Sequence, residues 1–208
     1  MTQSEHVASI ITQLANSHCD QEEIKRVYKE WSSTYDQDLD DFGYVAPQIG
    51  AEIFHQANGN VSGLILDAGC GTGLTGKELS QRGYTQLHGC DFSPDMRAVA
   101  KQTGVYSQLM EADFTKPLAV ADAVYDGVLC IGVYYSEMKR YFLPELIRIV
   151  KPMSVICISC RFHFFDEDLH LQAKQFEEDG VLTIESVTRQ PYMKGQGADA
   201  AYIVLRKC

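Results

Sequence analysis

A turn with alternating glycines, placed directly after a short apolar run, constrains this chain more than any other feature of its sequence. The run Leu64-Ile65-Leu66 is followed by Asp67-Ala68-Gly69-Cys70-Gly71-Thr72-Gly73, and a helical pattern begins at Leu74. Glycine permits such a turn because it has no Cβ atom to clash. Backbone N–H groups of the turn can approach a ligand, and the positive end of the next helix points to the same place. The pattern predicts a ligand site at the carboxyl end of this strand.

Strands and helices alternate along the chain from residue 61 onward. The predicted strands are 61–66, 86–90, 105–110, 123–131, 154–161, 181–188 and 200–206, and the predicted helices are 74–82, 94–102, 139–150 and 169–178. This alternation predicts a mostly parallel sheet with right-handed crossovers and helices on both faces. Because no helix separates the last two strands, we expect them to form an antiparallel hairpin at one edge. The expected fold class is therefore α/β and Rossmann-like, with seven strands.

The first sixty residues have a helical pattern instead. Apolar residues recur at helical spacing in 7–14 and in 24–31, and a third helix is expected to start near Ala46-Pro47 and to be stopped by Asn58-Gly59. A chain of 208 residues suffices for one domain and is short for two. We therefore expect a single domain, in which an N-terminal helical cap (1–60) precedes the α/β core (61–208).

Acidic residues follow three consecutive predicted strands. Asp67 disfavours a pyrophosphate at the glycine turn and suits a cofactor with a cationic amino group and a sulfonium. Asp91 ends the second strand, where a carboxylate can accept hydrogen bonds from ribose hydroxyls; Ser93 can cap the next helix, so Asp91 stays available for a ligand. Asp113 can accept from an adenine amino group while Phe114 covers the ring. Together these residues predict a nucleoside site.

The glycines allow a second interpretation. Residues 71–76 also match the dinucleotide fingerprint G-x-G-x-x-G. In that fingerprint the first glycine normally follows the strand immediately, whereas residues 67–70 intervene here. Simple dinucleotide folds also have no obligatory acid at the position of Asp113. An NAD(P)-dependent oxidoreductase is therefore the alternative function, and a protein that binds its cofactor without turnover is another.

The order of these motifs resembles the class I S-adenosylmethionine-dependent methyltransferases. The resemblance rests on Asp67-x-Gly-x-Gly-x-Gly, on Asp91, on Asp113-Phe114 and on the strand 123–131, and it covers roughly residues 20–208. More narrowly, the chain is similar to the methyltransferase-like proteins of the Williams–Beuren chromosomal region. That similarity lies in the segments 27–38, 44–47, 65–74 and 86–89. It implies S-adenosylmethionine as cofactor and S-adenosylhomocysteine as product.

The resemblance also implies roles for individual residues. Gly69, Cys70 and Gly71 should line the methionine part of the cofactor, and Phe92 or Met96 should pack on the adenine. Tyr28, Trp31 and Tyr35 belong to a segment that folds over the cofactor in related enzymes, although Trp31 fits a core position equally well. Independently of the resemblance, Ile131 and Gly132 at the end of the fourth predicted strand can shape the wall around the sulfonium, and a buried strand end explains them equally well. The complete set of expected cofactor-binding residues is Tyr28, Tyr35, Asp67, Gly69, Cys70, Gly71, Asp91, Phe92, Met96, Asp113, Phe114 and Ile131.

Catalytic residues are not identified by the sequence. Methyl transfer mainly requires alignment of the acceptor and exclusion of water, and a base is needed for acceptors such as a hydroxyl. Arg161 suits an acceptor carboxylate, but Asp166 and Glu167 nearby offer it a structural partner. The candidates for the acceptor side, including any base, are Tyr134, Tyr135, His163 and Tyr192, with Glu137 on the same loop as the first two.

The composition of the chain limits which partners and which cellular location we expect. The formal net charge is −10 and no Lys/Arg cluster occurs, which argues against nucleic acid and favours a small-molecule methyl acceptor. No apolar run is long enough to span a bilayer, and the N-terminus lacks a signal-peptide core. We expect a cytoplasmic monomer or homodimer that does not bind membranes.

The cysteines and histidines do not suggest a metal or redox site. Cys157 and Cys160 match C-x-x-C, but they lie in an apolar strand pattern. Residues three apart in a strand point to opposite faces, so a structural role is expected for both. The histidines show no ligand spacing with acids or cysteines, and no metal is expected.

Overall fold

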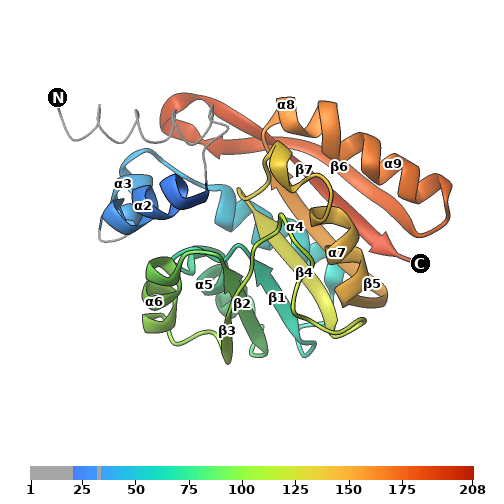
Figure 1. The fold of residues 1–208 in the computed structure, drawn as a ribbon, viewed down its shortest axis with the longest axis horizontal. Helices are drawn as coiled ribbons and strands as arrows, with labels where there is room; N and C mark the ends of the chain where they lie inside the picture. Colours follow the sequence, from blue (N-terminus) through green and yellow to red (C-terminus); the bar gives the residue numbers. More distant parts are fainter. Residues whose placement is uncertain (1–20, 32–33) are drawn as a thin grey trace.

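The computed structural model describes residues 21–31 and 34–208 and shows a seven-stranded sheet with helices packed on both faces (Figure 1). The strand order is β3-β2-β1-β4-β5-β7-β6. Neighbouring strands from β3 to β5 are parallel, whereas β7 is antiparallel to both β5 and β6. The predicted Rossmann-like α/β fold and its terminal hairpin are confirmed. The strands are β1 (Ile65–Ala68), β2 (Leu87–Asp91), β3 (Gln108–Glu111), β4 (Tyr125–Ile131), β5 (Val150–Cys160), β6 (Leu182–Met193) and β7 (Ala198–Lys207).

The helices alternate with the strands after residue 61, as predicted. Helix α4 ends where Gly59 adopts a left-handed conformation (φ 63°), and Pro94 opens α6. The predicted helix at 7–14 lies outside the described residues. The helices are α2 (Gln21–Trp31), α3 (Tyr35–Asp41), α4 (Ala46–Asn58), α5 (Leu74–Gln81), α6 (Pro94–Gln102), α7 (Phe142–Ile149), α8 (Phe162–Phe164) and α9 (His170–Glu178). None of the helices in the described part of the chain has the length and apolar character needed to cross a membrane.

Successive side chains of the central strands point to opposite faces of the sheet, and this divides the core into two layers. On β4, Val128 and Cys130 are buried with the residues of α7, whereas Leu129 and Ile131 are buried with Phe54 of α4. The same alternation separates Cys157 from Cys160 on β5, since Cys157 belongs to the α4 layer and Cys160 to the α7 layer. The two thiols therefore lie on opposite faces of the sheet, as expected for a structural C-x-x-C.

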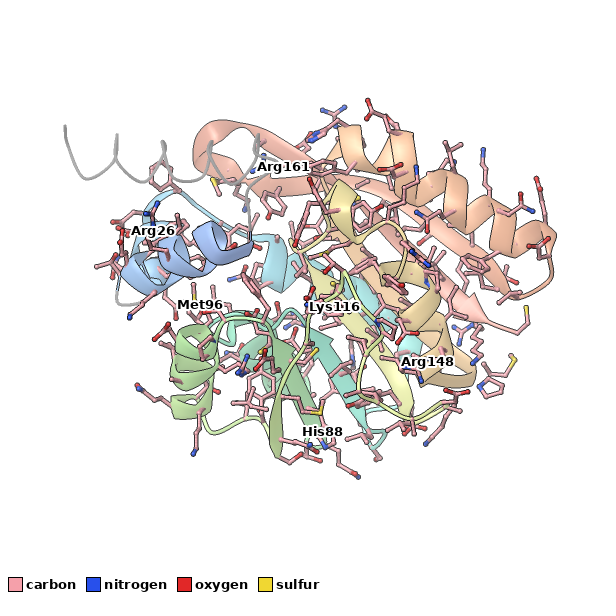
Figure 2. All side chains as sticks on the ribbon, viewed as in Figure 1. Arg26, His88, Met96, Lys116, Arg148 and Arg161 are labelled. Carbon is pink, nitrogen blue, oxygen red and sulfur yellow. The ribbon has the colours of Figure 1, made fainter. Side chains whose placement is uncertain are left out.

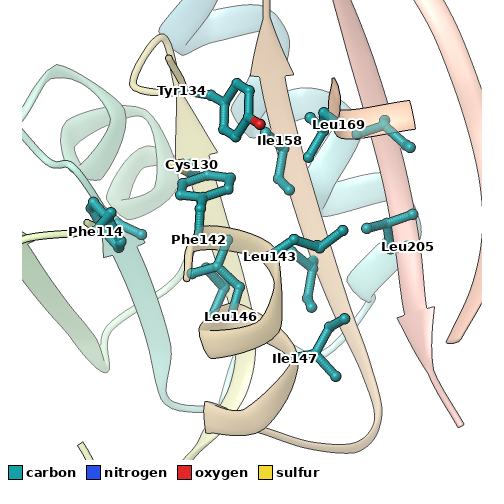
Figure 3. Packing of buried hydrophobic residues seen from close by; sticks show 14 of the residues in the cluster. Phe114, Cys130, Tyr134, Phe142, Leu143, Leu146, Ile147, Ile158, Leu169 and Leu205 are labelled. Carbon is teal, nitrogen blue, oxygen red and sulfur yellow. The ribbon is translucent and has the colours of Figure 1, made fainter. Parts of the chain in front are cut away.

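Helix α7 fills the layer opposite α4. Its residues Phe142, Leu143 and Leu146 are completely buried against the sheet, and Figure 3 shows them beside Cys130 of β4 and Ile158 of β5. Phe142 and Phe114 meet edge to face, with 5.5 Å between their ring centroids. This contact joins the core to the loop after β3, which is one wall of the candidate site.

Several element boundaries differ from the sequence prediction. β1 begins at Ile65 rather than residue 61, because its pairing with Leu87 of β2 and Gly127 of β4 begins there. β5 begins earlier than predicted, and the sequence did not predict α3 at all. A π-helical turn (Phe165–Leu169) links α8 to α9, in a segment for which the sequence predicted no element before residue 169.

The N-terminal segment is tied to the terminal hairpin. Tyr44 forms an isolated antiparallel bridge with Met193, and the Val45 N–H donates to the Tyr192 carbonyl (3.1 Å). Helix α4 continues from this bridge across one face of the sheet, while α2 and α3 lie at the carboxyl ends of the strands (Figure 1). The division into a 1–60 cap and a 61–208 core stays a prediction.

We predict that Leu146→Ala lowers the free energy of unfolding by about 2–5 kcal/mol, because a fully buried leucine leaves a cavity when truncated. Leu171→Ala is the matched control, since this leucine of α9 is 58% exposed. Urea denaturation followed by circular dichroism measures both. An equal decrease in the free energy of unfolding in the two variants would contradict the packing described for α7.

Candidate functional site

A cavity runs along the carboxyl edge of the sheet, from the loop after β3 to the end of β6. The predicted cofactor-binding residues line it, with the exception of Asp67 and Cys70. The lining also contains residues that the sequence did not single out for the site, among them Leu39, Met138, Phe164 and Met193. The cavity therefore brings together side chains from the N-terminal helices, the glycine turn, the strand ends and the terminal hairpin.

The glycine turn is shaped by three residues with positive φ: Gly69 (77°), Gly71 (51°) and Gly73 (95°). A Cβ atom on Gly69 would lie 2.2 Å from the side chain of Val133, so this position has no room for one. A Cβ atom on Gly71 would meet nothing within 4 Å. Gly71 therefore presents bare backbone to the cavity, which suits close approach of a ligand.

Asp91 is fixed at the end of β2 by backbone donors. Its Oδ2 accepts from the Gly71 N–H (3.0 Å) and its Oδ1 from the Ser93 N–H (2.9 Å). Burial raises the pKa of this carboxyl, and the bonds from Ser93 and Gly71 oppose the rise. Ser93 Oγ in turn accepts from the Met96 N–H (3.3 Å) and caps α6. The carboxylate keeps unused lone pairs, which can accept from further donors.

Asp113 lies on the loop after β3 and already has partners there. Its Oδ1 accepts from the N–H (2.9 Å) and the hydroxyl (2.6 Å) of Thr115, and its Oδ2 pairs with Lys116 (2.7 Å). Phe114 lines the cavity next to it and is also part of the α7 core layer. The loop is thus rigidly joined to the core.

Aromatic side chains of the N-terminal helices cover this half of the cavity. The Tyr28 ring meets Phe92 edge to face (6.1 Å between centroids), and Tyr35 contacts both Tyr28 (6.1 Å) and Trp31 (4.6 Å). Trp31 is buried and donates from Nε1 to Asp38 Oδ2 (2.8 Å), so it serves as a core residue as well as a wall.

A polar contact attaches α3 to the glycine turn. Asp36, in the first turn of α3, accepts a hydrogen bond from the Thr72 hydroxyl and lies 3.5 Å from Lys77 Nζ of α5. This contact holds the N-terminal helices, whose aromatic side chains cover the cavity, to the glycine turn on the opposite side.

Asp67 lies beneath the glycine turn and not in the cavity lining. It is 1% exposed; the Tyr106 hydroxyl donates to its Oδ2 (2.6 Å), and its Oδ1 has no hydrogen-bond partner within the described part of the chain. Cys70 is also buried, and its Sγ would lie 3.1 Å from a Cβ atom on Gly89. Both side chains therefore point into the sheet layer and not toward the cavity, because the turn directs them away from it.

The other half of the cavity contains tyrosines. The rings of Tyr44 and Tyr192 meet edge to face (5.1 Å), and both hydroxyls point at Gly132, where a Cβ atom would lie 2.6 Å from Tyr192 Oη and 2.9 Å from Tyr44 Oη. Burial raises the pKa of Tyr192 and raises that of Tyr44 well above its usual value. Both phenols are therefore protonated at neutral pH and are able to donate hydrogen bonds.

The structure places only some of the acceptor-side candidates in the cavity. Tyr134, Tyr135 and Tyr192 line the cavity, whereas His163 is exposed outside the lining, with its ring 3.8 Å from that of Phe164. Tyr44 completes this wall; the signal that marks it in the sequence is the Tyr44-x-Ala46-Pro47 motif. Among the described residues, no three His, Cys, Asp or Glu side chains are arranged to bind a metal ion.

We predict that Asp67 makes stability depend on pH. Burial raises the pKa of Asp67 to about 7, whereas an aspartate in an unfolded chain titrates near 3.9. The stability it contributes is therefore complete below about pH 4 and is lost as the pH rises to about 7. In urea titrations over this range, Asp67→Asn should gain stability relative to wild type with rising pH. The exposed Asp179→Asn is the control, and a pH-independent difference for Asp67→Asn would refute the assignment.

Known proteins resemble the chain in sequence and in fold. A family model described as a methyltransferase domain matches residues 65–153. The chain is 36% identical to methyltransferase-like protein 27 of Homo sapiens over 162 residues, which are 74% of this chain and 66% of that protein's length. It is 37% identical over 68 residues to the 18S rRNA (guanine-N(7))-methyltransferase RID2 of Arabidopsis thaliana, with 33% of this chain and 23% of that protein covered.

The magnesium protoporphyrin IX methyltransferase of Synechocystis PCC 6803, solved with bound S-adenosylhomocysteine, has the same fold. Its TM-score is 0.67 at 16% sequence identity, with 91% of this chain and 100% of that chain covered. The antiparallel β7 between β5 and β6 and the family match both disfavour the dinucleotide interpretation of residues 71–76. The chain belongs to the class I S-adenosylmethionine-dependent methyltransferases.

Proposed function

We propose that the chain transfers a methyl group from S-adenosylmethionine to an O, N or S atom of a small-molecule acceptor. The observation that carries this proposal is a cavity with two unlike halves. One half has Asp91, Asp113 and the bare backbone of Gly71, and the other has a wall of tyrosines at Gly132. A nucleoside suits the first half and an acceptor suits the second.

The residues of the first half fit the cofactor. Asp91 would accept from the ribose hydroxyls with the lone pairs that Gly71 and Ser93 leave unused. Phe92 and Met96 would contact the adenine, and the backbone of Gly69 and Gly71 would line the methionine part. The bound cofactor supplies a methyl carbon that its sulfonium has already activated for in-line displacement.

The second half orients the acceptor rather than deprotonating it. Tyr44 and Tyr192 are protonated at neutral pH, and His163 lies outside the lining. Burial also raises the pKa of Tyr134. We infer that the acceptor enters as a nucleophile, as an amine, a thiolate or an ionised oxygen, and that the aromatic wall excludes water.

The remaining predictions concern partners and location. Among the described residues that line the cavity, Arg161 is the single positively charged side chain, which supports a small acceptor over a polyanion. The exclusion of nucleic acid, the cytoplasmic location and the monomeric or homodimeric state stay predictions.

We predict that wild-type protein binds both S-adenosylmethionine and S-adenosylhomocysteine in calorimetric titrations and does not bind NAD. Asp91→Ala should weaken the binding of both sulfur nucleosides by about 10- to 100-fold, because a hydrogen bond to a charged group contributes about 1.5–3 kcal/mol. Asp95→Ala, on the neighbouring helix α6, is the control. Thermal melts of each variant exclude unfolding as the cause. Binding of NAD alone would contradict the proposal.

We predict that Tyr192→Phe lowers kcat/KM by about tenfold or less, because it removes a neutral hydrogen-bond donor. A general base would cost about 10²–10⁴-fold. Acceptors found by screening with labelled methyl groups allow the measurement. The pH–rate profile should be the same in wild type and variant, and a lost inflection in the variant would identify Tyr192 as a base. Protein that binds cofactor but methylates no acceptor would favour the non-catalytic alternative.

A further inference from the structure

We infer that Arg161 binds a carboxylate of the methyl acceptor, which makes small organic acids the substrate class of this site. The inference rests on the proposed function and adds to it a chemical group that the acceptor must carry. It is carried by the place of Arg161 in the cavity, by the absence of a carboxylate partner for its guanidinium within residues 21–31 and 34–208, and by the side chains around it.

Arg161 lies at the acceptor end of the cavity. It directly follows β5 and precedes α8, whereas Asp91 ends β2. Three strand spacings separate β2 from β5 in the order β2-β1-β4-β5, which is about 14 Å at the carboxyl edge. Figure 2 shows Arg161 near α8 and Met96 on α6, well apart from each other. A nucleoside held at Asp91 therefore leaves room for an acceptor before Arg161.

The guanidinium of Arg161 has no carboxylate partner among the residues that the structure describes. The sequence suggested Asp166 or Glu167, but both are exposed and neither forms an ion pair with Arg161. The next acid, Asp168, is bonded to Lys139 instead. A partly buried cation without a counter-ion is costly, and a ligand carboxylate would remove that cost.

The surroundings favour a single carboxylate over a more highly charged group. Arg161 shares the cavity with Tyr28, Tyr192 and Phe164, and its charge opposes the rise in the pKa of both tyrosines. A guanidinium binds a carboxylate with two parallel hydrogen bonds, and an apolar wall strengthens the pair. A phosphate dianion would need a second cation, and none of the other described residues that line the cavity is a lysine, arginine or histidine.

The carboxylate that Arg161 binds could instead belong to the methionine part of the cofactor. The methionine part is expected along the glycine turn at the end of β1, two strand spacings or about 10 Å from β5. That separation favours a carboxylate of the acceptor over the carboxylate of the cofactor. The experiment below distinguishes these two ligands of Arg161.

The test uses full-length protein saturated with S-adenosylhomocysteine and pairs of acids and primary amides, such as benzoate with benzamide and phenylacetate with phenylacetamide. Calorimetry should show that at least one acid binds tenfold or more tightly than its amide. Arg161→Gln should abolish this preference, and Arg161→Lys should restore part of it. Arg140→Gln, which removes an exposed arginine outside the lining, should leave the preference unchanged.

Each alternative has its own outcome. Loss of S-adenosylhomocysteine affinity in Arg161→Gln, without any preference for acids in wild type, would assign Arg161 to the cofactor carboxylate and overturn the inference. Equal binding of acids and amides in every pair would overturn it too. If wild type binds no S-adenosylhomocysteine, the proposed function fails, and the acid and amide pairs are then titrated against the free protein. A preference for acids that Arg161→Gln abolishes would still support the inference there.

Discussion

Parallel pairing of β1 with β2 on one side and β4 on the other is the constraint on which the rest of the structure depends. Register pairs Asp67 with Gly89 of β2 and with Leu129 of β4, so the carboxyl ends of the three strands meet at one edge. The glycine turn, Asp91 and Gly132 therefore lie side by side although they are far apart in the sequence. The same strands, buried on both faces, supply the two core layers that hold this edge rigid.

Electrostatics divide the cavity along that edge. Backbone donors at Gly71 and Ser93 keep Asp91 oriented at the nucleoside half. The half proposed for the acceptor has tyrosines that stay protonated and, among its described lining residues, one guanidinium, which suits it to orient an anion. A methyl donor that carries its own activation needs no more from the protein than this arrangement gives. Under the proposed function, the two halves thus perform separate tasks within one cavity.

Local patterns were sufficient to predict the alternation of elements, the glycine turn and Asp91. Each of these features depends on a few neighbouring residues: apolar periodicity, glycines with positive φ, or an acid at a strand end. The burial of Asp67 and Cys70 was not predictable, because it depends on packing against Tyr106 and Gly89. The motif at Tyr44 marked that residue but did not predict its contact with Tyr192, which is far along the chain. Helix α3 was missed because its acidic sequence has little apolar periodicity.

The contact of Tyr44 with Tyr192 has a consequence for the order in which the site forms. The residues that hold the nucleoside half lie mostly in one continuous stretch from the glycine turn to Phe114, which emerges from the ribosome together. Tyr44 is synthesised early, but its partner Tyr192 and the bridge to Met193 come near the end of the chain. During synthesis, the residues proposed to hold the cofactor thus leave the ribosome before the residues of the proposed acceptor wall are all present.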